Sequence, residues 1–405
     1  MISNIKYQID RIIRVIINIK KRVQLILFAN KIHYLTKLNQ LNIIQWAEKF
    51  STIREVDSDE TSLVGYGKKL QKSIISQYGG KYASCKTLRI LIHTPSPSIS
   101  PAGYSIFTNW VNALNFMGIQ TQCLEWNQSI ENSLNSFRPN IFLTSDDKGY
   151  IDRVNWSAVQ KYRSENSLRI GLTASIEAYG NTPLTGRIVK AKEIGVNFYY
   201  SFRAKSYINK RKEYQQFFQE GYEIYNVEFS ANPLLYFPVD GIIKDLSYIY
   251  LGSSNLDKFD RTRKWFSEII QKDAGFINGP GWAGMNTQIP MDLNRYLYSR
   301  SAVGLNLHLQ EQIEWASEIN ERTYVLAACG VPQLVDNPKL LLDRFSSDAV
   351  FEACNPKKYA SLYKDIINNP EEAARRSRIA LNEVYEKHTI FHRMEEFIKK
   401  LNIKG

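Results

Sequence analysis

The amino-acid sequence predicts an α/β protein with two parallel β-sheets and an N-terminal helical extension. The chain has 405 residues, more than a single hydrophobic core usually serves. Its composition, 44% hydrophobic and 23% charged, lies in the range of globular proteins. Short apolar runs alternate with helical patterns of ten or more residues, an order typical of parallel sheets with helices on both faces. These observations favour two compact domains over one.

Residues 1–80 form the predicted extension and linker, and their first half is strongly basic. Residues 1–40 carry eight Lys or Arg against one acid, Asp10, in a chain whose net charge is +12. Apolar residues recur in this segment at helical spacing, which predicts one amphipathic basic helix. These apolar residues are Ile9, Ile12, Ile16, Ile19, Val23, Ile26 and Leu27.

Two interpretations of the basic helix remain open. It is either an anchor on a membrane surface, attracted to anionic lipid, or a helix packed on its own protein with a solvated basic edge. It is too polar to span a bilayer, because its longest stretch without charge covers only 23–30. No secretory cleavage site follows it, and no motif that reads nucleic acid accompanies the charge. We therefore expect a cytoplasmic protein, unlikely to bind nucleic acid, with peripheral contact at the inner membrane surface through residues 1–40 left open.

The first predicted domain covers residues 87–235. It opens with an apolar run at 88–92, followed by a loop with several prolines and a helix over 104–117. Further strands are expected at 119–124, 140–144, 169–173 and 196–200. This succession of strand, loop and helix predicts a Rossmann-like domain with a parallel sheet.

The second predicted domain, residues 240–385, repeats the pattern. Its first strand, 248–251, ends at Gly252 and leads into a helix over 261–271. Later strands are expected at 274–277, 302–307, 333–335 and 349–351, and helices at 321–328 and 359–367. A C-terminal helix is predicted over 386–405, and its crossing back to the first domain is left open. Two Rossmann-like domains facing a cleft would bind ligands at the carboxyl ends of both sheets.

Residues 317–332 carry the strongest chemical signal in the sequence. Asn320 is a suitable N-cap, the next eight residues favour a helix, and Gly330 ends it. The unpaired amides and the dipole of such an N-terminus favour an anion such as a diphosphate, with Arg322 as a bidentate partner. Pairing of Arg322 with Glu318 on the helix surface is the alternative.

This stretch resembles the signature of the group 1 glycosyltransferases, particularly of the branch similar to the spore-maturation glycosyltransferases. That pattern is Asn-Glu-Arg-x-Phe-Glu followed by Ala-x-Gly, and the residues that fit it are Asn320, Glu321, Arg322, Tyr324 and Gly330. Other stretches fit in the same order, at 231–238, 250–253, 279–282, 298–299, 304–308 and 388–393. The resemblance covers residues 225–400 well, the first domain only in general layout, and residues 1–80 not at all.

The resemblance implies a GT-B glycosyltransferase that moves a sugar from a nucleotide-diphosphate sugar to a glycan, a lipid-linked intermediate or a small metabolite. It assigns donor binding to Gly252, Ser253, Arg261, Gly281, Trp282, Asn306, Asn320, Glu321, Arg322 and Thr323. The purely structural alternatives are a solvated helix start for Arg261 and a core position for Trp282. One position departs from the family, because the Glu that would hold the nucleotide ribose is Val325 here. A catalytically silent GT-B-like binding or scaffold protein is therefore the alternative function, and an epimerase acting on a nucleotide sugar is a third.

Catalysis is expected from residues that end strands at the predicted cleft. Asp146, with Asp147 beside it, would act as a base or hold acceptor hydroxyls, unless both are solvated strand-end acids. His308 is the second catalytic candidate, with a buried structural histidine as its alternative. The loop after the first strand and the helix that follows it supply the acceptor or sugar side, with His93, Gly103 and Tyr104.

The sequence contains no recognisable metal site. It has no HExxH motif, no Cys/His cluster and no suitable Asp-x-Asp loop, and its four cysteines lie far apart. The resemblance likewise implies transfer without a metal or other cofactor, with the nucleotide sugar as a substrate. Arg and Lys side chains and a helix N-terminus would then stabilise the charge on the leaving diphosphate.

Overall fold

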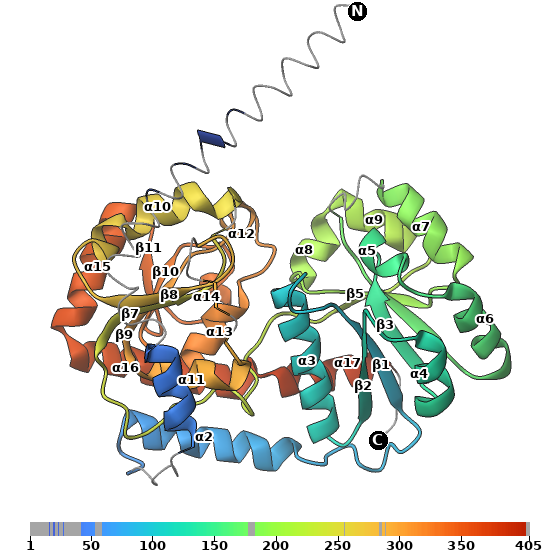
Figure 1. The fold of residues 1–405 in the computed structure, drawn as a ribbon, viewed down its shortest axis with the longest axis horizontal. Coiled ribbons are helices and arrows are strands. Elements are labelled where there is room, and N and C mark those ends of the chain that lie inside the picture. The colour runs from blue at the N-terminus through green and yellow to red at the C-terminus, as the bar shows by residue number, and fades with distance from the viewer. Residues whose placement is uncertain are drawn as a thin grey trace, which may run out of the picture. The chain divides into compact units, whose positions relative to one another are not determined.

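Two parallel β-sheets form the framework of the computed structural model (Figure 1). The structure describes residues 16, 19–20, 23, 27, 42–52, 59–176, 183–254, 256–282, 286–287 and 289–401. Internal contacts divide the chain into two compact units. The first unit consists of Lys69–Leu235, Trp315–Val325 and Glu383–Gly405, and the second of Met1–Lys68, Tyr236–Glu314 and Leu326–Asn382.

The first unit is built on a six-stranded sheet in the order β2-β1-β3-β4-β5-β6, with all neighbours parallel. Its strands are β1 (Arg89–Thr94), β2 (Gln120–Glu125), β3 (Ile141–Ser145), β4 (Arg169–Thr173), β5 (Phe198–Ser201) and β6 (Ile224–Asn226). Every residue of β3 and β5 is buried, which explains why these strands read as continuous runs without alternation. The sequence predicted all of these strands except β6.

Helices connect these strands. They are α3 (Pro101–Phe116), α4 (Ile130–Phe137), α5 (Lys148–Ile151), α6 (Trp156–Glu165), α7 (Leu184–Glu193), α8 (Lys205–Lys210) and α9 (Lys212–Gln219), whereas α2 (Leu63–Tyr78) precedes β1. The start of α3 lies three residues before the predicted 104, because Ser100 caps it and Pro101 suits the first turn. The Ser100 side chain accepts a hydrogen bond from the Gly103 amide at 3.3 Å.

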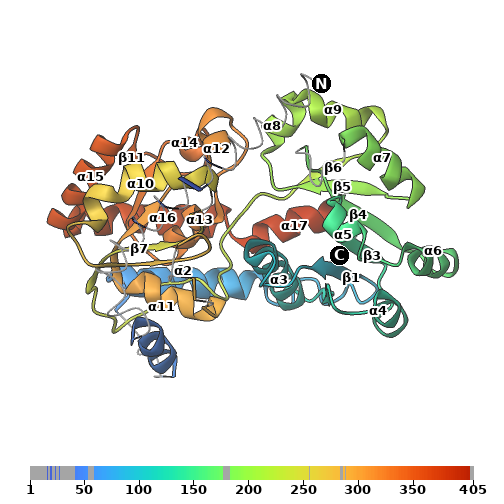
Figure 2. The same cartoon turned by 45° about the horizontal axis from the view of Figure 1, so that its top comes forward.

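The C-terminal helix α17 (Ile390–Lys400) also belongs to the first unit. It buries Phe391, Met394 and Phe397, and it lies beside α3 (Figure 2). The Phe391 ring stacks on Phe116 with the centroids 5.3 Å apart and on Tyr78 at 5.4 Å. A segment at the end of the chain thus completes the core of the first unit.

The second unit carries a five-stranded parallel sheet in the order β11-β10-β9-β7-β8. Its strands are β7 (Leu246–Leu251), β8 (Gly275–Asn278), β9 (Ser301–Asn306), β10 (Gln333–Asp336) and β11 (Phe351–Ala353). Its helical elements are α10 (Leu256–Ile270), η2 (Met291–Leu293), α11 (Asn294–Ser299), α12 (Gln310–Glu314), α14 (Leu341–Arg344), α15 (Pro356–Asn368) and α16 (Pro370–Lys387), and α13 (Glu321–Ala328) ends in it.

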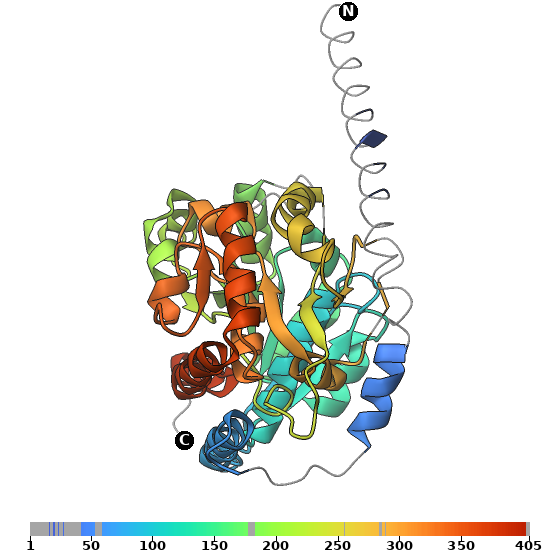
Figure 3. The same cartoon turned by 90° about the vertical axis from the view of Figure 1, so that its left-hand side faces the viewer.

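Helices pack on both faces of this second sheet, which Figure 3 turns toward the viewer. On one face, Phe266 of α10 and Tyr359 of α15 join a buried cluster with strand residues such as Leu305. On the other face α13 approaches closely, because a Cβ at Gly304 would lie only 2.5 Å from a methyl carbon of Leu326. The glycine in β9 therefore sets how near the helix can lie.

The structure matches two sequence predictions only in part. The strand predicted at 349–351 begins at Phe351, because Ala349 and Val350 are buried in a turn before it. The predicted basic helix within 1–40 lies mostly outside the described residues, and positions 16, 19, 20, 23 and 27 are helical and exposed. Within the part of the chain that the structure describes, no helix combines the length and apolar character that crossing a membrane requires.

Candidate functional site

The loop after β7 is held tightly by the segment after β8. The Gly252 amide donates to the Asn278 carbonyl at 2.9 Å, and Trp282 Nε1 donates to the Gly252 carbonyl at 2.8 Å. Gly279 has φ 148°, and a Cβ there would lie 2.4 Å from the Gly252 oxygen. Trp282 is buried against Tyr250, so it supports this loop from inside the domain. Ser253 and Gly281 flank these contacts.

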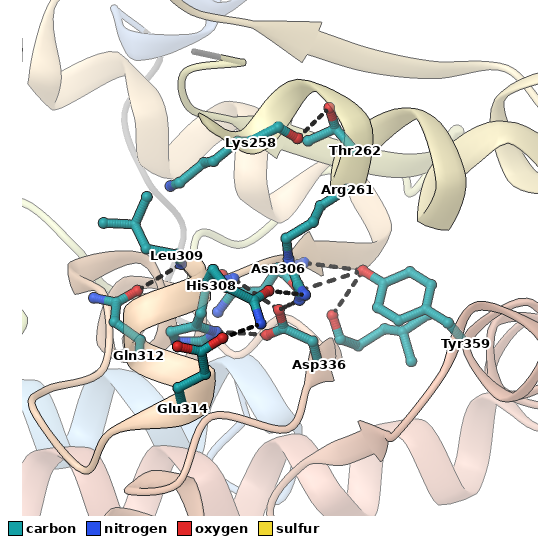
Figure 4. A network of polar contacts seen from close by, with 12 residues as sticks. Lys258, Arg261, Thr262, Asn306, His308, Leu309, Gln312, Glu314, Asp336 and Tyr359 are labelled. Carbon is teal, nitrogen blue, oxygen red and sulfur yellow. Dashed lines mark hydrogen bonds and ion pairs between the residues drawn. The ribbon is translucent and has the colours of Figure 1, made fainter. Parts of the chain in front are cut away.

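A polar network joins the carboxyl ends of β9 and β10 (Figure 4). The backbone amide of His308 donates to Asp336 Oδ2 at 2.9 Å, and His308 Nδ1 lies 2.6 Å from Asp336 Oδ1. Arg261 donates to Asp336 Oδ2 at 2.7 Å and to Gln310 Oε1 at 3.0 Å. Both the His308 and Asp336 side chains are fully buried. The network brings together two predicted residues, Arg261 and His308, through an aspartate that the sequence analysis missed.

Asp336 is the anionic centre of this network. Burial alone would raise the pKa of its carboxyl, but His308 and, more weakly, Arg261 hold the pKa below its ordinary value. On the neighbouring strand, the Asn306 amide donates to the hydroxyl of Tyr359 at 3.1 Å. The backbone that carries Asn306 and His308 is thus fixed from both sides. Because none of the His308 side chain is exposed, its role is to hold Asp336 in position.

The first unit contains a pocket of about 440 Å³ at the carboxyl ends of β3, β4 and β5. Aromatic rings line it, among them Trp126, Tyr150 and Phe202, together with hydroxyl groups such as those of Ser145 and Thr173. It lies next to the point where the strand order reverses between β1 and β3, which is where open α/β sheets bind ligands. The pocket is therefore a candidate binding site in this unit.

Gly103 is the one acceptor-side candidate that lines this pocket directly. A Cβ at Gly103 would lie 2.9 Å from Ser100 Oγ and 3.0 Å from Pro95 Cγ, so these side chains approach the first turn of α3 closely at this glycine. Tyr104 follows it half-buried in the first turn of α3, and its carbonyl accepts from Thr108 Oγ1 at 2.6 Å.

His93 lies behind the aromatic wall. Its Nδ1 is 2.9 Å from Thr144 Oγ1, and its ring meets Tyr150 edge-on with the centroids 5.4 Å apart. Burial, aided by the charge of Arg153, lowers the pKa of His93 to about 4. The imidazole is therefore neutral near pH 7 and supports the wall, since it is only 2% exposed.

The two acids after β3 have separate surroundings. Asp146 is buried and accepts from Arg187 Nη1 at 2.5 Å and from Thr173 Oγ1 at 3.2 Å. Burial raises the pKa of Asp146 to about 7, against the lowering effect of Arg187. Asp146 and Arg187 line a different pocket of about 290 Å³, whereas Asp147 lines the 440 Å³ pocket. Asp147, and not the predicted Asp146, therefore lies at the 440 Å³ pocket.

The segment Trp315–Val325 belongs to the first unit, although the sequence places it within the second domain. The Ala204 amide donates to the Ser317 carbonyl at 2.6 Å, and Arg203 forms an ion pair with Glu318. Arg211 lies over the Trp315 ring, 4.9 Å from its centroid. The segment therefore brings the motif at 320–323 to this unit.

At the start of α13, Asn320 acts as the helix cap that the sequence predicted. Its Oδ1 accepts from the Thr323 amide and from Thr323 Oγ1, each at 3.1 Å. The Glu321 carboxylate accepts from Asn109 at 3.5 Å, and burial raises its pKa to about 7 although Arg322 and Asn109 lower it. Arg322 is half-buried in the first turn, where a helix favours anions.

The predicted residues thus form two groups. One group lies at the carboxyl edge of the second sheet and comprises Gly252, Ser253, Arg261, Gly281, Trp282, Asn306 and His308; the other lies in the first unit and comprises His93, Gly103, Tyr104, Asp146 and the residues 320–323. Sequence reasoning missed Asp336 and Arg203. Asp336 directly follows a predicted strand and ends β10, and Arg203 lies in the loop after β5, so position at a strand end is the signal that could have found them.

Among the described residues, no group of three or more His, Cys, Asp or Glu side chains is arranged to hold a metal ion. Glu318 pairs with Arg203, Asp336 with Arg261 and Asp146 with Arg187. These carboxylates at the two sheet edges therefore lie against guanidinium groups.

Comparison with known proteins gives one family match and several similar folds. Residues 261–399 match the family model described as glycosyl transferase-like. T4 phage β-glucosyltransferase in complex with its UDP-glucose substrate has a TM-score of 0.51 at 12% identity, over 78% of this chain and 100% of that chain. Anabaena HepE in complex with UDP-glucose has a TM-score of 0.50 at 10% identity, over 78% and 99%. No curated protein sequence matches significantly.

A further structure of the T4 phage protein contains UDP and Mn²⁺, with a TM-score of 0.50 at 12% identity over 78% of this chain and 100% of that chain. At such identities the likeness shows the fold alone. The predicted α/β architecture with two parallel sheets is confirmed. The resemblance to the spore-maturation branch stays a prediction.

Proposed function

We propose that this chain, a glycosyltransferase by its C-terminal domain and its GT-B fold, moves a sugar from a nucleotide-diphosphate sugar to a hydroxyl acceptor without a metal ion. The observation that carries the proposal is the start of α13, where Asn320 caps the helix and Arg322 lies in its first turn. Amides and a guanidinium at one helix start suit a diphosphate, both bound and leaving.

In the second unit, the residues after β7 and β9 would bind donor phosphates at the carboxyl edge of the sheet. The backbone of Gly252 and Ser253 would approach the phosphates, because the contacts from Trp282 and Asn278 hold this loop in place. Arg261, Asn306 and Gly281 lie at the same sheet edge, with His308 acting through Asp336 as a positioning residue. Lys258 and Arg263 on α10 would add positive charge.

On the acceptor side we assign the base role to Asp147 in place of Asp146. Asp146 is committed to Arg187 and lines a different pocket. Asp147 lines the 440 Å³ pocket with Gly103, and its Oδ1 accepts from the Gly149 amide at 2.6 Å, which leaves its orientation fixed. A carboxylate so held can accept the proton of an acceptor hydroxyl.

The donor proposal predicts a thermal shift. The purified protein is screened in EDTA against UDP, GDP and TDP and their sugars, and a ligand at 100 times its dissociation constant should stabilise it by about 2.7 kcal/mol. Arg322→Ala should lose at least about tenfold in affinity, because charge-assisted hydrogen bonds contribute about 1.5–3 kcal/mol. Arg344→Ala, a partly buried arginine at the end of α14 and away from the start of α13 in sequence, is the control. Binding that requires added Mn²⁺ would refute metal independence.

A silent binding protein is the second candidate, and one position favours it. Val325, where the family has a ribose-holding Glu, is 4% exposed and apolar. If no nucleotide binds in the screen, the transferase proposal fails and a scaffold role follows. Binding of a UDP-sugar followed by release of UDP supports transfer.

We also propose that the basic segment contacts anionic membrane surfaces. Its described apolar side chains are exposed, each by half or more: Ile16, Ile19, Val23 and Leu27. They stand at spacings of three and four, so they share one helix face beside a cluster of Lys and Arg.

The membrane contact predicts cosedimentation with vesicles that contain phosphatidylserine and not with neutral phosphatidylcholine vesicles. Replacing Lys20, Lys21 and Arg22 by Glu should abolish it, because each basic residue contributes about 1 kcal/mol near such a surface. Lys357→Glu with Lys358→Glu, two exposed lysines of α15, is the control. Equal pelleting of the wild type and the Lys20 to Arg22 variant would reject the proposal.

A further inference from the structure

The loop after β5 and the helix that follows it carry a run of positive charge. Residues 203–212, with the sequence Arg-Ala-Lys-Ser-Tyr-Ile-Asn-Lys-Arg-Lys, contain five cations and no acid. Helix α8 lies within this run and packs beside α9 (Figure 1). It buries Tyr207 and Ile208, whereas its other residues, Lys205 and Lys210 among them, are exposed. Burial of the two apolar side chains thus turns the lysines of α8 to the surface of the first unit.

The exposed lysines of this run are not neutralised by neighbouring acids. Among the residues that the structure describes, no ion pair involves Lys205, Lys210 or Lys212, the exposed first residue of α9. The fourth cation, Arg211, differs from them, because it pairs with Glu213 at 2.9 Å. Uncompensated charges of one sign on a short helix and the start of the next favour an anionic partner.

A tryptophan is fixed beside the lysines. Both ends of α8 contact the segment 315–317, since the Ala204 amide donates to the Ser317 carbonyl at 2.6 Å and Arg211 lies 4.9 Å from the centroid of the Trp315 ring. Trp315 is 48% exposed, which makes it the most exposed of the chain's seven tryptophans. An indole has an apolar body and one N–H group, a combination that suits the boundary between lipid and water.

Two acids adjoin these residues in the sequence. Glu213 is the partner of Arg211, so this pair adds no net charge. Glu314 precedes Trp315, and its Oε1 accepts from Gln310 Nε2 at 2.9 Å. Even with Glu314 counted against them, the three lysines leave an excess of positive charge beside the exposed ring.

We propose that Lys205, Lys210, Lys212 and Trp315, the basic surface of the first unit, dock on an anionic lipid bilayer. The lysine stems would lie along the head groups with their amines on the lipid phosphates, and the indole would enter the head-group layer. A bilayer fits better than a nucleic acid, because single-strand binders stack successive bases on several aromatic rings and this surface exposes one.

This contact rests on the proposed membrane binding through residues 1–40 and adds a second one to it. Near an anionic surface each basic residue increases the affinity about fivefold, so three lysines alone hold a protein weakly. Once the N-terminal segment is bound, the basic surface meets the same bilayer at a high effective concentration. Loss of the basic surface should therefore weaken membrane binding without abolishing it.

The test uses the full-length protein and vesicles of phosphatidylcholine with about one third phosphatidylserine. Replacing the three lysines of the basic surface by glutamine should lower the apparent vesicle affinity at least about tenfold. The control carries the same charge change at three exposed lysines elsewhere in the first unit, as Lys86→Gln, Lys161→Gln and Lys387→Gln, and should stay within about twofold of the wild type. Equal losses in the two variants would show a general attraction and overturn the basic surface.

Phosphatidylcholine brominated in its acyl chains tests the tryptophan directly, because bromine quenches an indole that enters the bilayer. Part of the wild-type emission should be quenched on such vesicles, and Trp315→Phe should lack that part. The glutamine control should be quenched like the wild type. Identical quenching of the wild type and Trp315→Phe would exclude contact of Trp315 with the lipid, and this readout does not depend on the lysine variants.

The outcomes separate this proposal from those before it. If the wild type does not pellet with the vesicles, the membrane contact of residues 1–40 fails and the basic surface with it. If the wild type and the variant of the basic surface pellet equally, only the basic surface is overturned. Duplex DNA that binds more tightly than the vesicles, and less tightly after the lysines are replaced, would assign the surface to nucleic acid instead. None of these results alters the transferase proposal, which nucleotide binding tests.

Discussion

Replacing Asp147 by asparagine is expected to lower the transfer rate roughly 100- to 10,000-fold, the usual contribution of a general base. Asparagine caps helices as well as aspartate does, so the hydrogen bond from the Gly149 amide and the start of α5 should survive. The loss should therefore lie in kcat, with the dissociation constant of UDP-glucose unchanged. Single-turnover release of UDP in the presence of a neutral disaccharide measures it.

Two neighbouring aspartates serve as controls for Asp147. Asp152→Asn removes an exposed carboxylate that pairs with Lys148, and it should leave transfer unaltered. Asp146→Asn should lower stability more than turnover, because Asp146 is buried against Arg187. If Asp146→Asn abolishes turnover at full stability while Asp147→Asn keeps it, the base assignment is wrong.

The second large effect is expected at Asp336. Asp336→Asn removes the carboxylate shared by Arg261 and His308, and breaking a buried ion pair in this way costs about 3–5 kcal/mol. Urea unfolding monitored by circular dichroism measures the loss in the free energy of unfolding. Asp260→Asn, at an exposed pair 4.0 Å from Arg263 on α10, should change it by less than about 1 kcal/mol.

The pH dependence of unfolding gives an independent check on Asp336. Its pKa in the folded state lies below the ordinary value, so the unfolded chain takes up the proton first as the pH falls. The stabilisation is complete above the ordinary aspartate pKa of about 3.9 and is lost as the pH falls through the lower folded value. The acid limb of the stability curve should flatten in Asp336→Asn. An unaltered limb would contradict this role.

Much of the fold follows from local pattern. The buried strands of both sheets are apolar runs bounded by polar or glycine residues, and α13 begins and ends at the predicted residues 321 and 328. The strand β6 was missed because three residues give no periodicity to detect. The early start of α3 followed from the Ser100 cap and Pro101, which the pattern of apolar residues does not report.

The candidate site was predictable only in part. Glycine and polar residues after strands point to the sheet edges, which is why Gly252, His308 and Gly103 were singled out. The contacts that define the two sheet edges join distant segments: His308 lies against Asp336, and Arg203, which was not predicted, pairs with Glu318, 115 positions away. The local spacing of residues carries no information on such pairs. Likewise, the sequence does not show which of the two pockets Asp146 or Asp147 lines.

The interrupted course of the first unit has a consequence for synthesis on the ribosome. Its core needs α17, whose Phe391 packs on Phe116 and whose Phe397 packs on Phe198 of β5, both from much earlier in the chain. Folding of this unit therefore waits until α17 has left the exit tunnel, and until then Phe116, Trp110 and Phe198 lack the rings that cover them in the folded unit.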